Sequence, residues 1–171
     1  MDDILRQKEA RVSTIRHLLT KYPNTIICFK LNIPGPIKNN QYIFEIFTEG
    51  RQAILDRFSA AGSRCLYDKS KFSDAGDELY VVVAEDPVLV KEWMCEIEEK
   101  HFFGRLFDID VISGDGTVSR TRIGLSERKC LLCDERATVC GRSRKHTVKE
   151  LQEKISEIFE KRILNKGFES A

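Results

Sequence analysis

The fold is decided by the stretch Gly104-Arg105-Leu106-Phe107-Asp108-Ile109-Asp110-Val111, in which apolar and acidic residues alternate after the first three positions. This alternation predicts a β-strand whose apolar residues pack in the core. Asp108 and Asp110 then share the opposite face, where a rigid backbone holds the two carboxylates close together. Carboxylates that close repel each other unless a cation lies between them. Mg²⁺ held by one or two carboxylates and by substrate phosphates is a common solution.

Arginines near this strand favour a phosphate site over the alternative, in which the acids only keep a solvent-facing strand soluble. Acidic residues are poor strand formers, and Arg105 lies just upstream of the pair. Gly114-Asp115-Gly116 predicts a tight turn, after which residues 117–123 would return as a hairpin strand that carries Arg120 and Arg122. Guanidinium groups suit phosphate because they bind its oxygens in pairs.

Other segments of the chain supply the elements around this hairpin. Helices are predicted at residues 4–21, 42–61, 88–100 and 147–164, and further strands at 25–33, 64–68 and 78–84. After the first helix, the order strand, helix, strand, strand, helix, strand is the split βαβ order of ferredoxin-like or palm-like sheets. The sequence therefore predicts the α+β class, with a βαββαβ sheet, flanking helices, an extra hairpin strand and a Cys-rich loop.

The length of 171 residues predicts a single catalytic domain over residues 1–171. Its parts are an N-terminal helix (4–21), an α/β core (about 25–123), a loop rich in Cys and Arg (124–146) and a C-terminal helix (147–164). The net charge of +1 gives no global reason to expect nucleic acid or membrane binding. Because charged residues interrupt the N-terminus and no apolar run could cross a membrane, we expect a cytoplasmic protein.

The loop at residues 124–146 combines potential metal ligands with basic residues. Zinc accepts four ligands of the types found at Cys130, Cys133, Cys140 and His146, although their spacing is not a common finger pattern. Between residues 120 and 146, eight Lys or Arg stand against three Asp or Glu, an excess that suits a polyphosphate. Three interpretations stay open: a structural zinc site; cysteines that pack as apolar residues while Arg142, Arg144 and His146 bind phosphate; and a solvated basic loop.

Three motifs resemble those of one known family, and they occur in its order. They are Leu31-Asn32-Ile33-Pro34-Gly35-Pro36-Ile37-Lys38, the strand Gly104–Val111 quoted above, and Arg128-Lys129-Cys130-Leu131-Leu132-Cys133 followed by Cys140-Gly141-Arg142-Ser143-Arg144-Lys145-His146. The chain resembles the CitX family, the holo-acyl-carrier-protein synthases of citrate lyase, over most of its length. The resemblance implies a nucleotidyltransferase. It would transfer 2'-(5''-triphosphoribosyl)-3'-dephospho-CoA to a serine of the apo acyl carrier (gamma) subunit of citrate lyase and release diphosphate.

This reaction gives each candidate residue an expected role. Asp108 and Asp110 would bind Mg²⁺ and, with Arg105, form the catalytic group. The remaining substrate-binding candidates are Arg120, Arg122, Arg142, Arg144 and His146 for the phosphates, and Asn32 and Lys38 for a ribose or a phosphate. Cys130, Cys133, Cys140 and His146 remain candidate zinc ligands.

Two other functions stay open at this point. A zinc-stabilised, non-catalytic module could bind an acidic partner through the basic loop. The equivalent synthase for the malonate decarboxylase carrier would use the same prosthetic group and differ only in its carrier.

Overall fold

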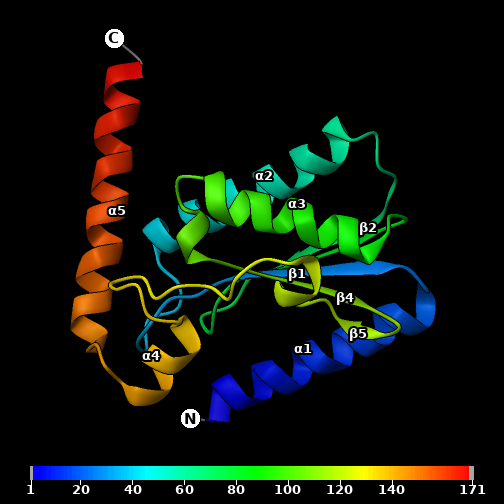
Figure 1. The fold of residues 1–171 in the computed structure, drawn as a ribbon, viewed down its shortest axis with the longest axis horizontal. Coiled ribbons are helices and arrows are strands. Elements are labelled where there is room, and N and C mark those ends of the chain that lie inside the picture. The colour runs from blue at the N-terminus through cyan, green and yellow to red at the C-terminus, as the bar shows by residue number, and fades with distance from the viewer. Residues whose placement is uncertain (1, 170–171) are drawn as a thin grey trace.

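A five-stranded antiparallel sheet with the strand order β2-β3-β1-β4-β5 forms the centre of the computed structural model, which describes residues 2–169 (Figure 1). The strands are β1 (Thr25–Leu31), β2 (Cys65–Lys71), β3 (Glu78–Val83), β4 (Phe107–Ser113) and β5 (Gly116–Thr117). The helices are α1 (Asp2–Lys21), α2 (Gln41–Ala60), α3 (Pro87–Lys100), α4 (Ala137–Ser143) and α5 (Val148–Glu169), with short 3-10 helices η1 (Gly104–Leu106) and η2 (Thr121–Ile123). The predicted α+β class is confirmed.

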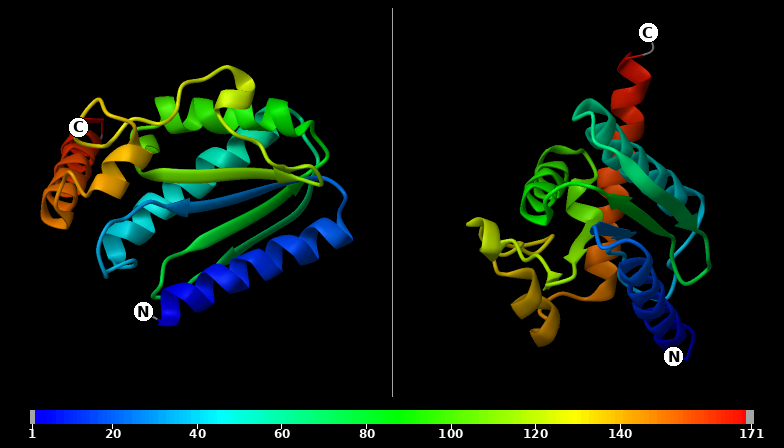
Figure 2. Two further views of the ribbon diagram at one scale, coloured as in Figure 1. Left: turned by 60° about the horizontal axis from the view of Figure 1, so that its bottom comes forward. Right: turned by 90° about the vertical axis from the view of Figure 1, so that its right-hand side faces the viewer.

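Helices cover both faces of the sheet (Figure 2). α1 lies along one face, where its Leu18 packs with Ile26, Cys28 and Ile112 of the sheet. α2 and α3 cover the other face and enclose the larger of the two hydrophobic clusters. α5 stands at one end of the sheet, beside the start of α2 (Figure 1). Among the described residues, no helix combines the length and apolar character needed to cross a membrane.

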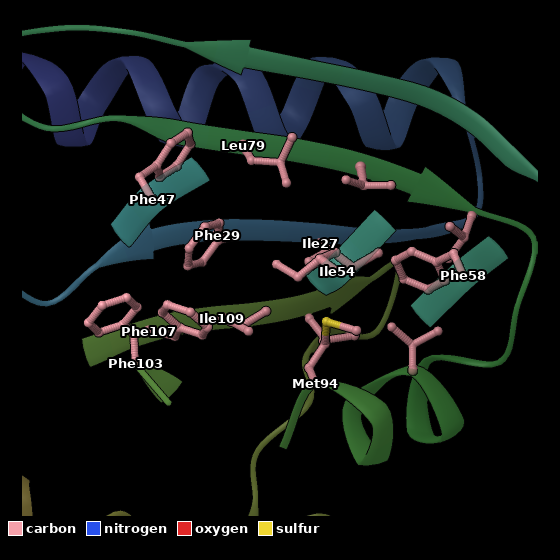
Figure 3. Packing of buried hydrophobic residues seen from close by; sticks show 14 of the residues in the cluster. Ile27, Phe29, Phe47, Ile54, Phe58, Leu79, Met94, Phe103, Phe107 and Ile109 are labelled. Carbon is pink, nitrogen blue, oxygen red and sulfur yellow. The ribbon is translucent and has the colours of Figure 1, made fainter. Parts of the chain in front are cut away.

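Aromatic side chains fill the core between the sheet and α2 (Figure 3). The ring of Phe29 on β1 stacks on Phe47 of α2 and meets Phe107 of β4 edge to face, with 5.2 Å between ring centroids in both pairs. α2 runs unbroken through Gly50. A side chain at this position would collide with the rings of Phe29 and Phe107. Glycine is therefore what lets the helix approach the strands this closely.

The predicted alternation on β4 is confirmed. Phe107, Ile109 and Val111 are buried in the cluster below α2 and α3, whereas Asp108 and Asp110 are partly exposed on the opposite face. Asp86 caps the third helix, because its carboxylate accepts hydrogen bonds from the first backbone N–H groups of α3. β4 is therefore anchored in the core through its apolar face, while its two carboxylates stay accessible on the other face.

The predicted hairpin strand at residues 117–123 is wrong beyond its first residue. β5 ends at Thr117, and the chain then turns into η2, so Arg120 and Arg122 do not lie on a strand that faces the acids. The side chain of Arg120 instead binds the Glu98 and Glu99 carboxylates of α3. These ion pairs hold the chain against α3 and away from the edge of the sheet. The strand propensity of single residues cannot predict such long-range contacts.

Three other predicted boundaries also change. Residues 104–106 form η1 before β4 begins, and α5 continues five residues beyond the predicted end at Leu164. The expected loop at 124–146 contains α4, a short helix that places Cys140 on its buried side. Lys129 and Arg136 form an isolated antiparallel bridge that closes the intervening turn around Cys130 and Cys133. The cysteine spacing therefore reflects a turn followed by a helix.

Replacement of Gly50 by Ala is expected to destabilise the protein. A Cβ there would lie 2.5 Å from a ring carbon of Phe29 and 2.9 Å from ring carbons of Phe107. Overpacking of this kind costs about 1–3 kcal/mol, more than the roughly 1 kcal/mol that Ala gains over Gly in a helix. Gly141→Ala in α4 is the control, because a Cβ there meets open space. Urea unfolding should show a loss for Gly50→Ala and none for Gly141→Ala; a stabilised Gly50→Ala would show that the core has room to spare.

Candidate active site

A lysine joins the two acids of β4. The register of β1 and β4 places Lys30 opposite Asp108 and Cys28 opposite Asp110. The Lys30 Nζ atom lies 2.8 Å from Oδ2 of Asp108 and 2.9 Å from Oδ2 of Asp110. Burial acts to lower the pKa of Lys30, but the two carboxylates outweigh it and hold that pKa above its ordinary value. Lys30 therefore stays charged and supplies a cation between the acids.

The backbone between the acids is held by two charged side chains of α3. The Ile109 N–H donates to Oε1 of Glu98 at 3.1 Å, and the Ile109 carbonyl accepts from Nζ of Lys91 at 3.0 Å. Both side chains are buried. Glu98 also binds Arg120 and Arg128, at 2.9 and 2.5 Å. This network fixes β4 and ties the segment after β5 to α3.

Asp108 lies between two hollows in the surface. The first, which we call the inner cavity, has a volume of about 250 Å³ and lies between α1, the end of β1 and the loop at residues 32–38. Its polar lining includes Lys8, Arg11, Lys30, Asn32, Lys38 and Asp108. Asn32 and Lys38 thus lie in one cavity with Asp108. Burial lowers the pKa of Lys38, whose ammonium donates to the Ile33 carbonyl.

The second hollow, which we call the basic groove, has a volume of about 600 Å³. It lies between β4, η2 and α4, and Asp108 and Asp110 both border it. Its basic lining consists of Lys91, Arg120, Arg128, Arg136 and Arg142. Arg142 on α4 and the acids of β4 therefore face one space.

The remaining arginine candidates lie outside both hollows. Arg105 on η1 donates to the Lys129 and Cys130 carbonyls at 3.1 and 2.6 Å, so it anchors the cysteine turn. Arg122 lies on η2, and neither it nor Arg144 lines the inner cavity or the basic groove. Arg144 ends α4 with a left-handed backbone at φ 49°, a conformation uncommon outside glycine. None of these three arginines therefore lines a hollow that Asp108 or Asp110 borders.

The four potential zinc ligands lie together. Their ligand atoms, from Cys130, Cys133, Cys140 and His146, all lie within 4.8 Å of one another. The Cys133 and Cys140 sulfurs are 3.8 Å apart, and Nε2 of His146 lies 3.3 Å from Sγ of Cys133. Burial acts to raise the pKa of Cys130, but hydrogen bonds led by the Leu132 backbone outweigh it and lower that pKa. Such a set can hold a metal ion, and His146 lies with the thiols rather than in the basic groove.

Sequence reasoning missed Lys30 and Glu98. Lys30 lies in a strand predicted from its apolar residues, and only the register with β4 reveals its position opposite the acids. Glu98 lies on a helix with many charged residues, and nothing in its spacing marks it as buried. Alternation gives only a partial signal for Lys30, because it places the side chains of Lys30 and Cys28 on one face of the strand without showing that the acids share that face.

These features define a class of protein: an α+β protein whose sheet presents a charged triad of two acids and a lysine at the junction of two partly basic hollows. The comparison with known families goes further. Residues 1–162 match the family model of CitX, the apo-citrate lyase phosphoribosyl-dephospho-CoA transferases. The chain belongs to this family, which confirms the resemblance found in the sequence.

Individual relatives agree with the family match. A protein of Vibrio cholerae serotype O1 (strain M66-2), named probable apo-citrate lyase phosphoribosyl-dephospho-CoA transferase, is 35% identical over 160 residues, covering 92% of this chain and 90% of its own. A protein of the same name from Streptococcus pyogenes serotype M3 is 34% identical over 163 residues, covering 92% and 84%. Protein CitXG of Haemophilus influenzae is 31% identical over 159 residues, covering 92% of this chain and 34% of its own length.

Removal of the Glu98 side chain is expected to destabilise the fold around the site. Glu98→Ala leaves the Arg120 and Arg128 guanidinium groups and the Ile109 N–H without their buried acceptor. Loss of one partner of a buried ion pair costs about 3 kcal/mol or more. Glu96→Ala is the matched control on the same helix, because Glu96 only pairs with Lys100 at the surface. Denaturant midpoints measure both, and equal losses in the two variants would contradict the role of Glu98.

Proposed function

We propose that this protein transfers the phosphoribosyl-dephospho-CoA group to a serine of the apo acyl carrier subunit of citrate lyase, with a 5''-triphosphate as the activated donor. The observation that carries the proposal is that Asp108, Asp110 and Lys30 lie together where two hollows meet, and that lysines and arginines are part of both linings. The family match and the names of the relatives support the choice of group and acceptor.

The reaction exchanges a phosphoanhydride bond of the donor for a phosphodiester bond to the carrier serine. The serine Oγ forms a bond to the α-phosphorus of the donor, the bond from that phosphorus to the diphosphate breaks, and the serine proton is released. Negative charge grows on the leaving diphosphate, so cations held in place before the reaction stabilise it most. Lys30 and Arg142 are the groups suited to this role, since both border a hollow that Asp108 also lines.

The acidic pair suits Mg²⁺ in this proposal. Asp108 and Asp110 offer carboxylate oxygens at the border of the basic groove, and Lys30 contacts one oxygen atom of each. Two carboxylates and one ammonium leave one net negative charge, which favours a divalent cation shared with substrate phosphates. Bound there, Mg²⁺ would neutralise charge on the phosphates.

Asn32 and Lys38 bind the middle of the donor in this proposal, because they line the inner cavity next to Asp108. The contacts of Arg105 with the Lys129 and Cys130 carbonyls support a positioning role for it rather than direct catalysis. The positions of Arg122, Arg144 and His146 give less support to their assignment to the triphosphate. They remain available to the carrier or, for His146, to a metal.

Zinc is the metal that best suits the cysteine cluster. Three cysteines and one histidine form a complete tetrahedral set of the structural kind, with no position left for a substrate. A zinc ion here would join the cysteine turn to α4 and to the start of α5. It would thereby fix Arg142 at the border of the basic groove.

Three further points belong to the proposal. The strand order β2-β3-β1-β4 supports the ferredoxin-like or palm-like assignment, with β5 as the extra strand and with residues 1–171 forming one catalytic domain. The transferase family gives no support to the non-catalytic module. The names of the relatives favour the citrate lyase carrier over that of malonate decarboxylase, and competition between the two apo carriers would test that choice.

Loss of either acid is expected to abolish transfer. Asp108→Asn and Asp110→Asn remove a charge that this proposal assigns to Mg²⁺, while the strand keeps its shape. Mass spectrometry of the apo carrier, incubated with enzyme, Mg²⁺ and triphosphate donor, should show no gain. Asp115→Asn, at the exposed turn of the same hairpin, is the control that should act normally. Normal turnover by Asp108→Asn or Asp110→Asn, with unchanged circular dichroism, would remove the metal role.

The zinc assignment predicts about one equivalent of zinc in the purified protein, by analogy with structural zinc sites. Cys133→Ser should lose the metal and lower the melting temperature, and a strong chelator should do the same to the native protein. Cys65→Ser is the control, because Cys65 is exposed on β2, outside the cluster. Metal-free protein of unchanged melting temperature would leave these cysteines as packing residues.

A further inference from the structure

A third hollow, which we call the apolar groove, lies between the start of α2, the loop at residues 32–38 and α5. Its volume is about 480 Å³. Its apolar lining includes Ile33, Ile43, Tyr42, Ile155, Phe159 and Ile163. Ile163 and Tyr42 are 54% and 57% exposed, so the groove presents large apolar side chains to solvent, a feature that often marks a binding site.

The apolar groove is built by close contacts rather than by a chance gap. The Tyr42 and Phe159 rings meet at 4.8 Å, and Gln152 of α5 donates to the Pro34 carbonyl at 3.4 Å. Gly35 has φ +90°, and a Cβ there would lie 2.7 Å from the Gln152 side chain. Glycine at this position therefore lets the loop touch α5 and close one side of the groove.

The three hollows are adjacent, in the order basic groove, inner cavity, apolar groove, and each shares lining residues with the next. Asp108 lines both the basic groove and the inner cavity, while Ile33 and Ile43 line both the inner cavity and the apolar groove. Charge changes along this series. The basic groove and the inner cavity carry lysines and arginines, whereas among residues 5–164, whose side chains the structure describes, the lining of the apolar groove contains neither and has Glu160 as its one charged residue.

We propose that the apolar groove receives the pantetheine arm of the donor. This inference rests on the proposed function and orients the substrate within it. The donor carries a triphosphate at one end and an uncharged arm of methylene, methyl and amide groups at the other. With the triphosphate beside Asp108 and Asp110, the nucleoside and its 5'-diphosphate lie in the inner cavity, and the arm extends past Ile33 into the apolar groove.

The chemistry of the lining selects this occupant. Burial of methylene and methyl groups against isoleucine and phenylalanine is favourable, and Asn40 and Ser156 offer polar atoms for the amides. An acidic carrier protein would find no basic residue among the described side chains of this lining. The volume is that of a small-molecule site.

Calorimetric titration with two probes tests the assignment. Dephospho-CoA has the arm, and ADP has the same adenosine diphosphate without it. The native protein should bind dephospho-CoA more tightly than ADP. Ile163→Glu should reduce that advantage about tenfold by placing a carboxylate in the groove, while ADP affinity stays the same. Leu164→Glu is the matched control, since Leu164 is the next residue of α5, is similarly exposed and is not part of the lining.

The opposite results overturn the inference. They are equal affinities of the native protein for the two probes, an unchanged advantage in Ile163→Glu, and weaker binding of apo carrier to Ile163→Glu with unchanged probe binding. The last result would make the groove a protein docking surface. Failure of the proposed function would look different: the apo carrier would gain no mass from the triphosphate donor, while the arm-dependent binding and its loss in Ile163→Glu would persist.

Discussion

The pairing of β1 with β4 is the constraint on which the rest of the structure depends. It places Phe29 next to Ile109 on the core face and Lys30 against Asp108 on the other. Because side chains alternate along a strand, a slip of one residue would turn both acids into the aromatic core and expose Phe107 and Ile109. The burial of those rings therefore holds the charged triad in place. Stability and the geometry of the site come from the same register.

The charge available for phosphate is smaller than the composition of the loop suggests. Of the basic residues in the basic groove, Arg120 and Arg128 pair with Glu98, Arg136 contacts Glu127, and Lys91 binds a backbone carbonyl. Arg142 is the one lining arginine that forms no ion pair with the side chains described by the structure, those of residues 5–164. Charged side chains that already have partners, such as Arg120 and Arg128 with Glu98, hold the structure in place and have less charge to offer a phosphate. A count of arginines thus overstates the positive charge that the site can offer to phosphate. Arg142 and Lys30 are the two residues expected to supply most of it.

Sequence patterns predicted the parts of this protein in which local chemistry decides the structure. Alternation on β4 and the helices α1, α2 and α3 depend on near neighbours, and these predictions were confirmed. The turn that brings Cys130 and Cys133 to Cys140 depends on α4, a helix too short to give a periodic signal. Lys30 and Glu98 acquire their roles from partners 78 to 80 and 11 to 30 residues away, respectively. Long-range pairs of this kind follow from register and packing, which a single sequence does not express.

The side chains that hold Ile109 have a consequence for behaviour at high concentration. β5 pairs with β4 through Ile112 and Ser113, so within residues 2–169 no strand lies along the outer edge of β4 beside Ile109. An open edge of this kind is a template on which strands of other molecules can add, leading to aggregates. Glu98 and Lys91 occupy the Ile109 N–H and carbonyl, and their burial hinders access to them. Glu98 and Lys91 thus both fix the position of β4 and block the pairing of its open edge with a strand of another molecule.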